Sequence, residues 1–241
     1  MTIPQTAADH AKFAAAKHAS DQVEQGMCVG LGTGSTAAWL VRCLGDRVRD
    51  QGLQIKAVPT SSRTAQLARE VGIDVQTLEQ VPHLDITIDG ADEFDSALNL
   101  IKGGGGALLQ EKVVAVASDK MIVITDATKQ VDTLGAFSLP VEVLQFGWKT
   151  TQRLIESQLA ASNMTDKKIS RRMLDAAPYV TDEGNFILDL QLVQIPDAPK
   201  LALWLNQIPG VVENGLFIDI CTQVLIGYAD GTISIRDKTL G

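Results

Sequence analysis

The first half of the chain alternates short apolar segments with longer segments of helix-favouring composition. We expect helices at residues 9–23, 35–48, 60–72 and 111–117, and buried strands at residues 27–32, 54–58, 73–77, 84–89 and 121–125. Strands that alternate with helices are typical of an α/β domain with a parallel sheet. Residues that follow such strands lie at the carboxyl edge of the sheet, where ligands bind.

The pattern changes at about residue 131. A strand at 140–144, a helix at 150–162, a strand at 186–190 and a helix at 197–208 indicate a small α+β unit with an antiparallel sheet. Short strands at 215–218, 224–227 and 232–235 then return the chain to the first domain. We therefore predict one domain from residues 1–131 and 208–241, and an inserted α+β domain at 132–207.

Composition excludes several classes of partner. The 241 residues carry a net charge of −8, which disfavours a nucleic-acid or anionic-membrane surface. We find no apolar run long enough for a membrane span and no signal-peptide pattern. Cys28, Cys43 and Cys221 have no metal-ligand spacing, which favours buried thiols in a reducing compartment. We expect a cytoplasmic protein without nucleic-acid or membrane partners.

The first candidate site is the glycine-rich segment GLGTGST, residues 30–36, which lies between a predicted strand and a predicted helix. It lacks the third glycine of a dinucleotide fingerprint and the lysine of a Walker A loop. Backbone N–H groups and the hydroxyls of Thr33, Ser35 and Thr36 at a helix N-terminus suit a small phosphate. The alternative is that Ser35 or Thr36 only caps the helix.

The second candidate site is the acidic segment DGADEFD, residues 89–95, which follows the predicted strand 84–89. Its carboxylates are Asp89, Asp92, Glu93 and Asp95, and their spacing does not match a calcium-binding loop. A magnesium site and a solvated acidic turn both remain open.

The third candidate site is IKGGGGALLQEK, residues 101–112, in which four glycines separate Lys102 from a helix that carries Glu111. Four glycines lose much backbone entropy on folding, so a close approach to a ligand is favoured over a flexible loop. Lys129 follows the strand 121–125. The three histidines lie outside these segments, and no metal cluster or paired nucleophile is indicated.

These residues favour proton transfer on a small phosphorylated molecule. A glutamate can remove a carbon-bound proton next to a carbonyl if a cation or a donor stabilises the resulting enediolate. Glu111 and the lysines of the candidate sites are the residue types that such chemistry needs.

The segments GLGTGST, DGADE, IKGGGGALLQEK, DATKQV and IPGVVENGLF resemble, in order and spacing, the ribose-5-phosphate isomerases of the A type. The resemblance covers essentially the whole chain. It implies interconversion of ribose 5-phosphate and ribulose 5-phosphate through a cis-enediolate, without a metal or an organic cofactor. It also implies a Rossmann-like α/β domain with a smaller ferredoxin-like domain, and a homodimer or homotetramer.

The resemblance also implies roles for individual residues. Glu111 would be the general base, Asp89 would assist ring opening, and Asp92 and Lys102 would hold the reacting end of the sugar. The remaining expected substrate-binding residues are Lys12, Thr33, Gly34, Ser35, Thr36, Gly90, Ala91, Gly103, Gly104, Gly105 and Lys129. The family varies at the fourth glycine of the run, Gly106, so the effect of this glycine on the turn stays open.

Two other classes of protein remain as alternatives. A sugar-phosphate-sensing domain would keep the phosphate site but would need no base, and a coenzyme A transferase-like enzyme would use its glutamate as a nucleophile. Glu111 together with Asp89 and Lys102 favours the isomerase over the sensor. The lack of a large basic or adenine-binding signature disfavours the transferase.

Overall fold

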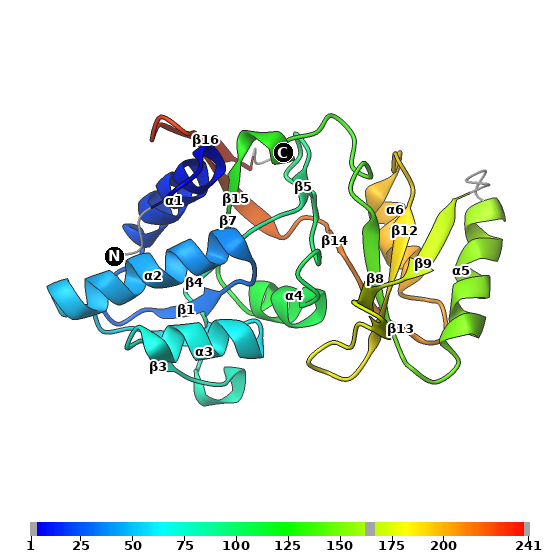
Figure 1. Ribbon diagram of the computed structural model, residues 1–241, viewed down its shortest axis with the longest axis horizontal. Coiled ribbons are helices and arrows are strands. Elements are labelled where there is room, and N and C mark those ends of the chain that lie inside the picture. Colours follow the sequence, from blue (N-terminus) through cyan, green and yellow to red (C-terminus); the bar gives the residue numbers. More distant parts are fainter. Residues whose placement is uncertain (1–3, 162–166, 239–241) are drawn as a thin grey trace. The chain divides into compact units, whose positions relative to one another are not determined.

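The computed structural model describes residues 4–161 and 167–238, which form two compact units (Figure 1). Within these residues, unit 1 contains 4–91, 110–130 and 219–238, and unit 2 contains 92–109, 131–161 and 167–218. The predicted limits of the inserted domain, 132–207, stay a prediction. Unit 2 also takes in residues 92–109 and 208–218, because short strands in these two segments pair with each other.

Unit 1 is built on a seven-stranded sheet with the order β16-β15-β7-β4-β1-β2-β3. Only β16 runs antiparallel to its neighbour. The strands are β1 (Cys28–Leu31), β2 (Lys56–Pro59), β3 (Asp74–Val75), β4 (Ile86–Asp89), β7 (Met121–Asp126), β15 (Cys221–Gly227) and β16 (Ile233–Asp237). The order reverses between β1 and β4, which creates the topological switch point where Rossmann-like domains bind ligands. The predicted Rossmann-like sheet is confirmed.

Helices cover both faces of this sheet. They are α1 (Ala7–Ser20), α2 (Ser35–Gln51), α3 (Ser62–Glu70) and α4 (Leu108–Val116). The main core joins α1, α2 and α3 to one face of the sheet, and Val114 of α4 packs with Cys28 and Val58 in a second cluster. Full burial of a leucine or isoleucine side chain contributes about 1.5–3 kcal/mol, so the larger core anchors the first three helices.

Unit 2 contains a four-stranded antiparallel sheet with the order β13-β8-β12-β9. The chain order is β8 (Leu139–Val143), α5 (Trp148–Ala161), β9 (Lys168–Arg171), β12 (Phe186–Gln191), α6 (Ala198–Leu205) and β13 (Val211–Asn214). This β-α-β-β-α-β sequence is the ferredoxin-like topology, so the predicted second fold is confirmed. Helix α5 is described as far as Ala161, and Ser162, the last residue of the predicted helix, lies outside the described residues.

Alternation along the strands of unit 2 gives the sheet two different faces. Leu139, Val141 and Val143 belong to the core that includes α5 and α6. Residues at the alternate positions, such as Glu142 and Asp189, lie on the other face, because successive side chains of a strand point to opposite sides.

Four two-residue strands of unit 2 had no counterpart in the sequence-based prediction: β5 (Glu93–Phe94), β6 (Leu100–Ile101), β10 (Met173–Leu174) and β11 (Ala177–Pro178). In contrast, β14 (Leu216–Phe217) falls within the predicted strand 215–218. β5, β6 and β14 form a three-stranded sheet, and β10 pairs with β11. The Glu93 carboxylate accepts hydrogen bonds from the backbone N–H groups of Gly135, at 2.7 Å, and Phe137. Part of the acidic segment is therefore structural.

Candidate active site

Three of the predicted groups share one edge of the unit 1 sheet. Residues 33–36 follow β1, Asp89 ends β4, and Lys129 ends a single-turn helix, Ala127–Lys129, that follows β7. Because β1, β4 and β7 are parallel neighbours, their carboxyl ends lie at the same edge. The fold therefore brings these groups to one edge of the sheet, with residues 33–36 and Asp89 on either side of the switch point.

Asp89 is completely buried and organises the first glycine-rich turn. Its Oδ1 atom accepts hydrogen bonds from the backbone N–H of Thr33 at 3.1 Å and from that of Gly90 at 2.7 Å. A Cβ atom on Gly32 would overlap the Asp89 carboxylate. Gly32 is therefore needed at this position to make room for the carboxylate.

The N-terminus of α2 carries the features expected of an anion site. The helix begins at Ser35 after Gly34, which has a φ of +120° and supplies no side-chain cap. The Ser35 hydroxyl instead accepts a hydrogen bond from the Lys12 Nζ atom at 3.0 Å. An ammonium group thus lies beside the unsatisfied N–H groups of a helix N-terminus, which is a favourable place for an anion. The simple helix-cap alternative for Ser35 does not describe this structure.

The Thr33 hydroxyl belongs to a cluster that sequence reasoning missed. It lies 2.8 Å from the hydroxyls of Thr60 and Ser61 and 3.2 Å from that of Thr64. Thr64 donates in turn to the carbonyl oxygen of Gly32 at 3.0 Å. The segment TSS, residues 60–62, follows β2 and was the available signal, because it also lies at the carboxyl edge.

Glu111 lies in the first turn of α4 and is only 4% exposed. A carboxylate at this end of a helix interacts favourably with the helix dipole. Lys129 is partly buried at the end of its single helical turn, and Asp126 caps this turn by accepting a hydrogen bond from the Thr128 N–H at 2.9 Å.

Lys102 belongs to unit 2 and is buried, with 2% of its surface exposed. Its backbone N–H donates to the carbonyl oxygen of Gly215 at 2.9 Å. Its Nζ atom lies 5.5 Å from the centre of the Phe217 ring, within range of a cation–π interaction. A lysine buried to this degree is unusual and is held in a defined position.

The four glycines form a tight turn in unit 2. The Gly106 N–H donates to the carbonyl oxygen of Gly103 at 3.0 Å, and both residues have positive φ, +81° and +107°. The Asp92 carboxylate accepts the Gly104 N–H at 2.7 Å. A Cβ atom on Gly106 would overlap the side chain of Tyr179, so the fourth glycine is required both by its φ and by this contact.

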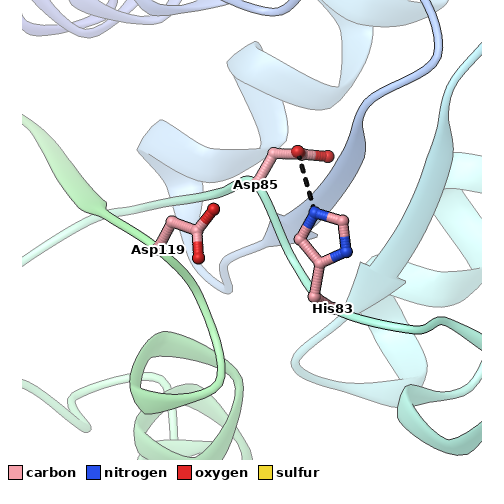
Figure 2. Close-up of side chains that lie close together, drawn as sticks. All are labelled: His83, Asp85 and Asp119. Carbon is pink, nitrogen blue, oxygen red and sulfur yellow. Dashed lines mark hydrogen bonds and ion pairs between the residues drawn. The ribbon is translucent and has the colours of Figure 1, made fainter.

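A separate group of side chains lies at the opposite, amino edge of the unit 1 sheet, before β4 and β7. His83, Asp85 and Asp119 place ligand-type atoms within 4.8 Å of one another (Figure 2). His83 Nε2 lies 3.1 Å from Asp85 Oδ1, and Asp85 Oδ2 accepts the backbone N–H of Cys28 at 2.7 Å. The Cys28 hydrogen bond is the main reason that the pKa of Asp85 lies below its usual value. These bonds give the group a structural role, and we assign no metal to it.

The fold and these residues define an α/β enzyme with a glycine-rich turn at its switch point. Among residues 4–161 and 167–238, no helix combines the length and the apolar character needed to cross a membrane.

Known proteins give a specific match. The family model for ribose 5-phosphate isomerase A (phosphoriboisomerase A) matches residues 56–231. A ribose-5-phosphate isomerase A from Ruegeria sp. (strain TM1040) is 66% identical over 233 residues, which cover 97% of this chain and 89% of that protein.

Solved structures agree with this match. The structure of ribose 5-phosphate isomerase A from Methanocaldococcus jannaschii has a TM-score of 0.85 and 39% identity, covering 94% of this chain and 98% of that chain. A D-ribose-5-phosphate isomerase in complex with phospho-erythronic acid has a TM-score of 0.88 and 38% identity, covering 97% and 100% of the two chains. The chain belongs to the ribose 5-phosphate isomerase A family. The predicted family and the predicted enzyme class, an isomerase, are confirmed.

Proposed function

We propose that the protein interconverts D-ribose 5-phosphate and D-ribulose 5-phosphate, a reaction of the non-oxidative branch of the pentose phosphate pathway. Glu111 moves a proton between C2 and C1 of the open-chain sugar, through a cis-enediolate intermediate. The observation that carries this proposal is the buried Glu111 in the first turn of α4, directly after the glycine turn, in a chain of this family. Burial keeps water away from a general base and strengthens its interactions with the substrate.

The phosphate group of the substrate binds at the N-terminus of α2. Gly34, Ser35 and Thr36 offer backbone N–H groups, and the Lys12 ammonium beside Ser35 supplies a positive charge. Thr33 contributes mainly by shaping the turn, because its N–H and its hydroxyl both bond within the protein. A relative was solved with phospho-erythronic acid, a phosphorylated sugar acid, which supports an anion site in the family.

Other residues of the candidate segments interact with the reacting end of the sugar. Asp89 assists ring opening and proton movement at the sugar oxygens, together with the backbone of Gly90 and Ala91 and the side chain of Lys129. Lys102 stabilises the negative charge of the enediolate, and Asp92 holds the sugar with the backbone of Gly103, Gly104 and Gly105. Support for these roles comes from the segments at residues 89–93, 101–112 and 126–131, in a chain of the isomerase family.

The proposal also includes the cellular compartment and the oligomeric state. The protein acts in the cytoplasm as a homodimer or homotetramer. The three cysteines are buried free thiols, which supports a reducing compartment. Sedimentation velocity would test the proposed oligomeric state, and a monomer at micromolar concentration would contradict a homodimer or homotetramer.

The experiment that tests the function is an isomerase assay on ribose 5-phosphate after exhaustive chelation. We expect turnover without added metal, and competitive inhibition by phospho-erythronic acid. No turnover with or without Mg²⁺, combined with tight binding of the sugar phosphate, would instead identify a sensor. Transfer of coenzyme A between acyl groups would identify the transferase alternative.

A further inference from the structure

Arg172 binds the backbone of the four-glycine turn. Its Nη1 atom donates to the carbonyl oxygen of Gly103 at 2.7 Å and to that of Gly104 at 3.2 Å. All of these groups belong to unit 2. The carbonyl oxygen of Gly103 also closes the turn by accepting a hydrogen bond from the Gly106 N–H. One guanidinium therefore binds two consecutive peptides of the turn.

The Arg172 side chain is itself held in place. Its Nε and Nη2 atoms form a two-pronged pair with the Asp189 carboxylate of β12, at 3.0 and 2.5 Å. The two side chains are only 15% and 20% exposed. A two-pronged arginine–carboxylate pair of this kind fixes orientation as well as position. The ferredoxin-like sheet thus supplies a rigid support for the turn.

These contacts determine which way the peptide groups of the turn face. In a trans peptide, the C=O and the following N–H point in opposite directions. The carbonyl of Gly104 is bound to Arg172, so the N–H of Gly105 is directed away from the guanidinium. Asp92 receives the N–H of Gly104 at 2.7 Å, which fixes the preceding peptide from its other side.

We propose that Arg172 is a positioning residue for catalysis. Held by Asp189, its guanidinium fixes the peptides of residues 103–105 in the orientation that the reacting end of the sugar needs, and it does so without touching the substrate. The catalytic part of this proposal rests on the proposed isomerase reaction. The effect on the turn can be measured without any activity.

The test compares two adjacent arginines. Arg171 is the matched control, because its guanidinium lies 4.4 Å from the Trp148 ring centre and 4.9 Å from that of Phe186, on the core side of the sheet. Arg172→Gln and Arg171→Gln remove the same charge from neighbouring positions. Each variant is assayed for kcat, KM and Tm, and by hydrogen–deuterium exchange of a peptide that covers residues 102–109.

In Arg172→Gln we expect faster hydrogen–deuterium exchange in this peptide. We also expect kcat to fall by about 10- to 100-fold, because a small misplacement of reacting groups lowers the rate strongly. KM should change by less than about threefold, since phosphate binding lies elsewhere. Arg171→Gln should lower Tm but leave kcat and the exchange of this peptide near wild type. Arg172→Lys, which keeps the charge but not the fork, should give an intermediate kcat.

Equal exchange and equal kcat in the two glutamine variants would overturn the proposal, and so would a wild-type kcat in Arg172→Lys. If wild-type protein does not isomerise ribose 5-phosphate, the proposed function fails. The exchange comparison alone then shows whether Arg172 holds the turn.

Discussion

The two glycine-rich turns of this chain use glycine for different purposes. In residues 30–36, Gly32 makes room for the Asp89 carboxylate, and Gly34 leads into a helix N-terminus beside Lys12. In residues 103–106, side chains bind the backbone itself, with Asp92 and Arg172 on either side of the same peptides. The first turn leads into a helix N-terminus, where N–H groups have no partner within the helix, whereas the second turn has peptides that side chains hold in place. A run of glycines therefore does not by itself identify an anion site.

The largest effect in this comparison should come from Gly32→Ala. The added methyl group displaces the Asp89 carboxylate, which breaks its hydrogen bonds to Thr33 and Gly90. We expect kcat/KM to fall by about 100-fold or more and Tm to fall, since overpacking costs about 1–3 kcal/mol.

The control for this prediction is Gly52→Ala. Gly52 has a φ of +69° and open space around its Cβ position, so alanine there adds backbone strain without moving a carboxylate. The control should lose stability and keep activity. If Gly32→Ala were as active as the control, the position of the Asp89 carboxylate would not matter for the function of the turn.

In the second turn, Gly106→Ala should have a smaller effect on activity than Gly32→Ala has in the first turn. Alanine at a φ of +81° must also push Tyr179 aside. We expect kcat to fall by about 10- to 100-fold with KM little changed. Gly184→Ala is matched in φ, at +79°, but has open space, and should leave steady-state kinetics unchanged. If both variants lose kcat equally, backbone strain and not the position of the turn is responsible.

The first turn predicts the opposite kinetic signature. Ser35→Ala combined with Thr36→Ala should raise KM for ribose 5-phosphate by about tenfold or more, since one lost hydrogen bond to a charged group is worth about 1.5–3 kcal/mol. The kcat value should stay within a few-fold of wild type. Ser62→Ala, at the equivalent first position of α3, serves as the control. Equal activity of wild-type protein on unphosphorylated ribose would contradict a phosphate site at this turn.

The smallest effect concerns Glu142, on the sheet face that also carries Asp189. The Glu142 side chain is fully buried, and its Oε1 atom accepts hydrogen bonds from Thr181 at 2.9 Å and Asn185 at 3.0 Å. Burial raises the pKa of this carboxyl, and the nearby charges of Glu183 and Glu213 add to the shift. The folded state therefore resists ionisation more than the unfolded state does.

This shift has a definite sign. Below its unfolded-state pKa, Glu142 is protonated in both states and its ionisation has no effect on stability. As the pH rises from the unfolded-state pKa to the folded-state pKa, the free energy of unfolding falls, and above the folded-state pKa it stays lowered. Glu142→Gln should therefore raise Tm at neutral pH, where each kcal/mol corresponds to about 2–4 °C. The gain should vanish at acidic pH, while kcat stays unchanged. A Tm difference that is independent of pH would mean that ionisation of Glu142 is not its source.

Much of the fold could be predicted because its elements are long enough to show a pattern. The strands β1, β4, β7 and β12 are apolar runs of four to six residues, and α2 and α3 follow capping or glycine signals. The two-residue strands β5, β6, β10 and β11 cannot show any period, so they were missed. The pairing of β6 with β14 joins distant parts of the chain, whereas β5 pairs with β6, and β10 with β11, within about ten residues.

The candidate site shows the same limit. Residues such as Ser35, Asp89 and Glu111 lie in dense local motifs and could be singled out from the sequence. Arg172 lies 69 residues from Gly103 and stands in no motif, so only the folded unit reveals that it binds the turn. The hydroxyl cluster around Thr33 was missed for the same reason, since it joins residues that follow two different strands.

The central claim is that Glu111, after the second turn, is the base of an isomerase. The most direct measurement is the steady-state turnover of ribose 5-phosphate by Glu111→Gln, with Glu156→Gln on α5 as an exposed control. We predict a kcat about 100-fold or more below wild type with little change in KM, because the amide keeps the shape of the side chain but cannot accept the proton. Turnover near the wild-type value would contradict the account.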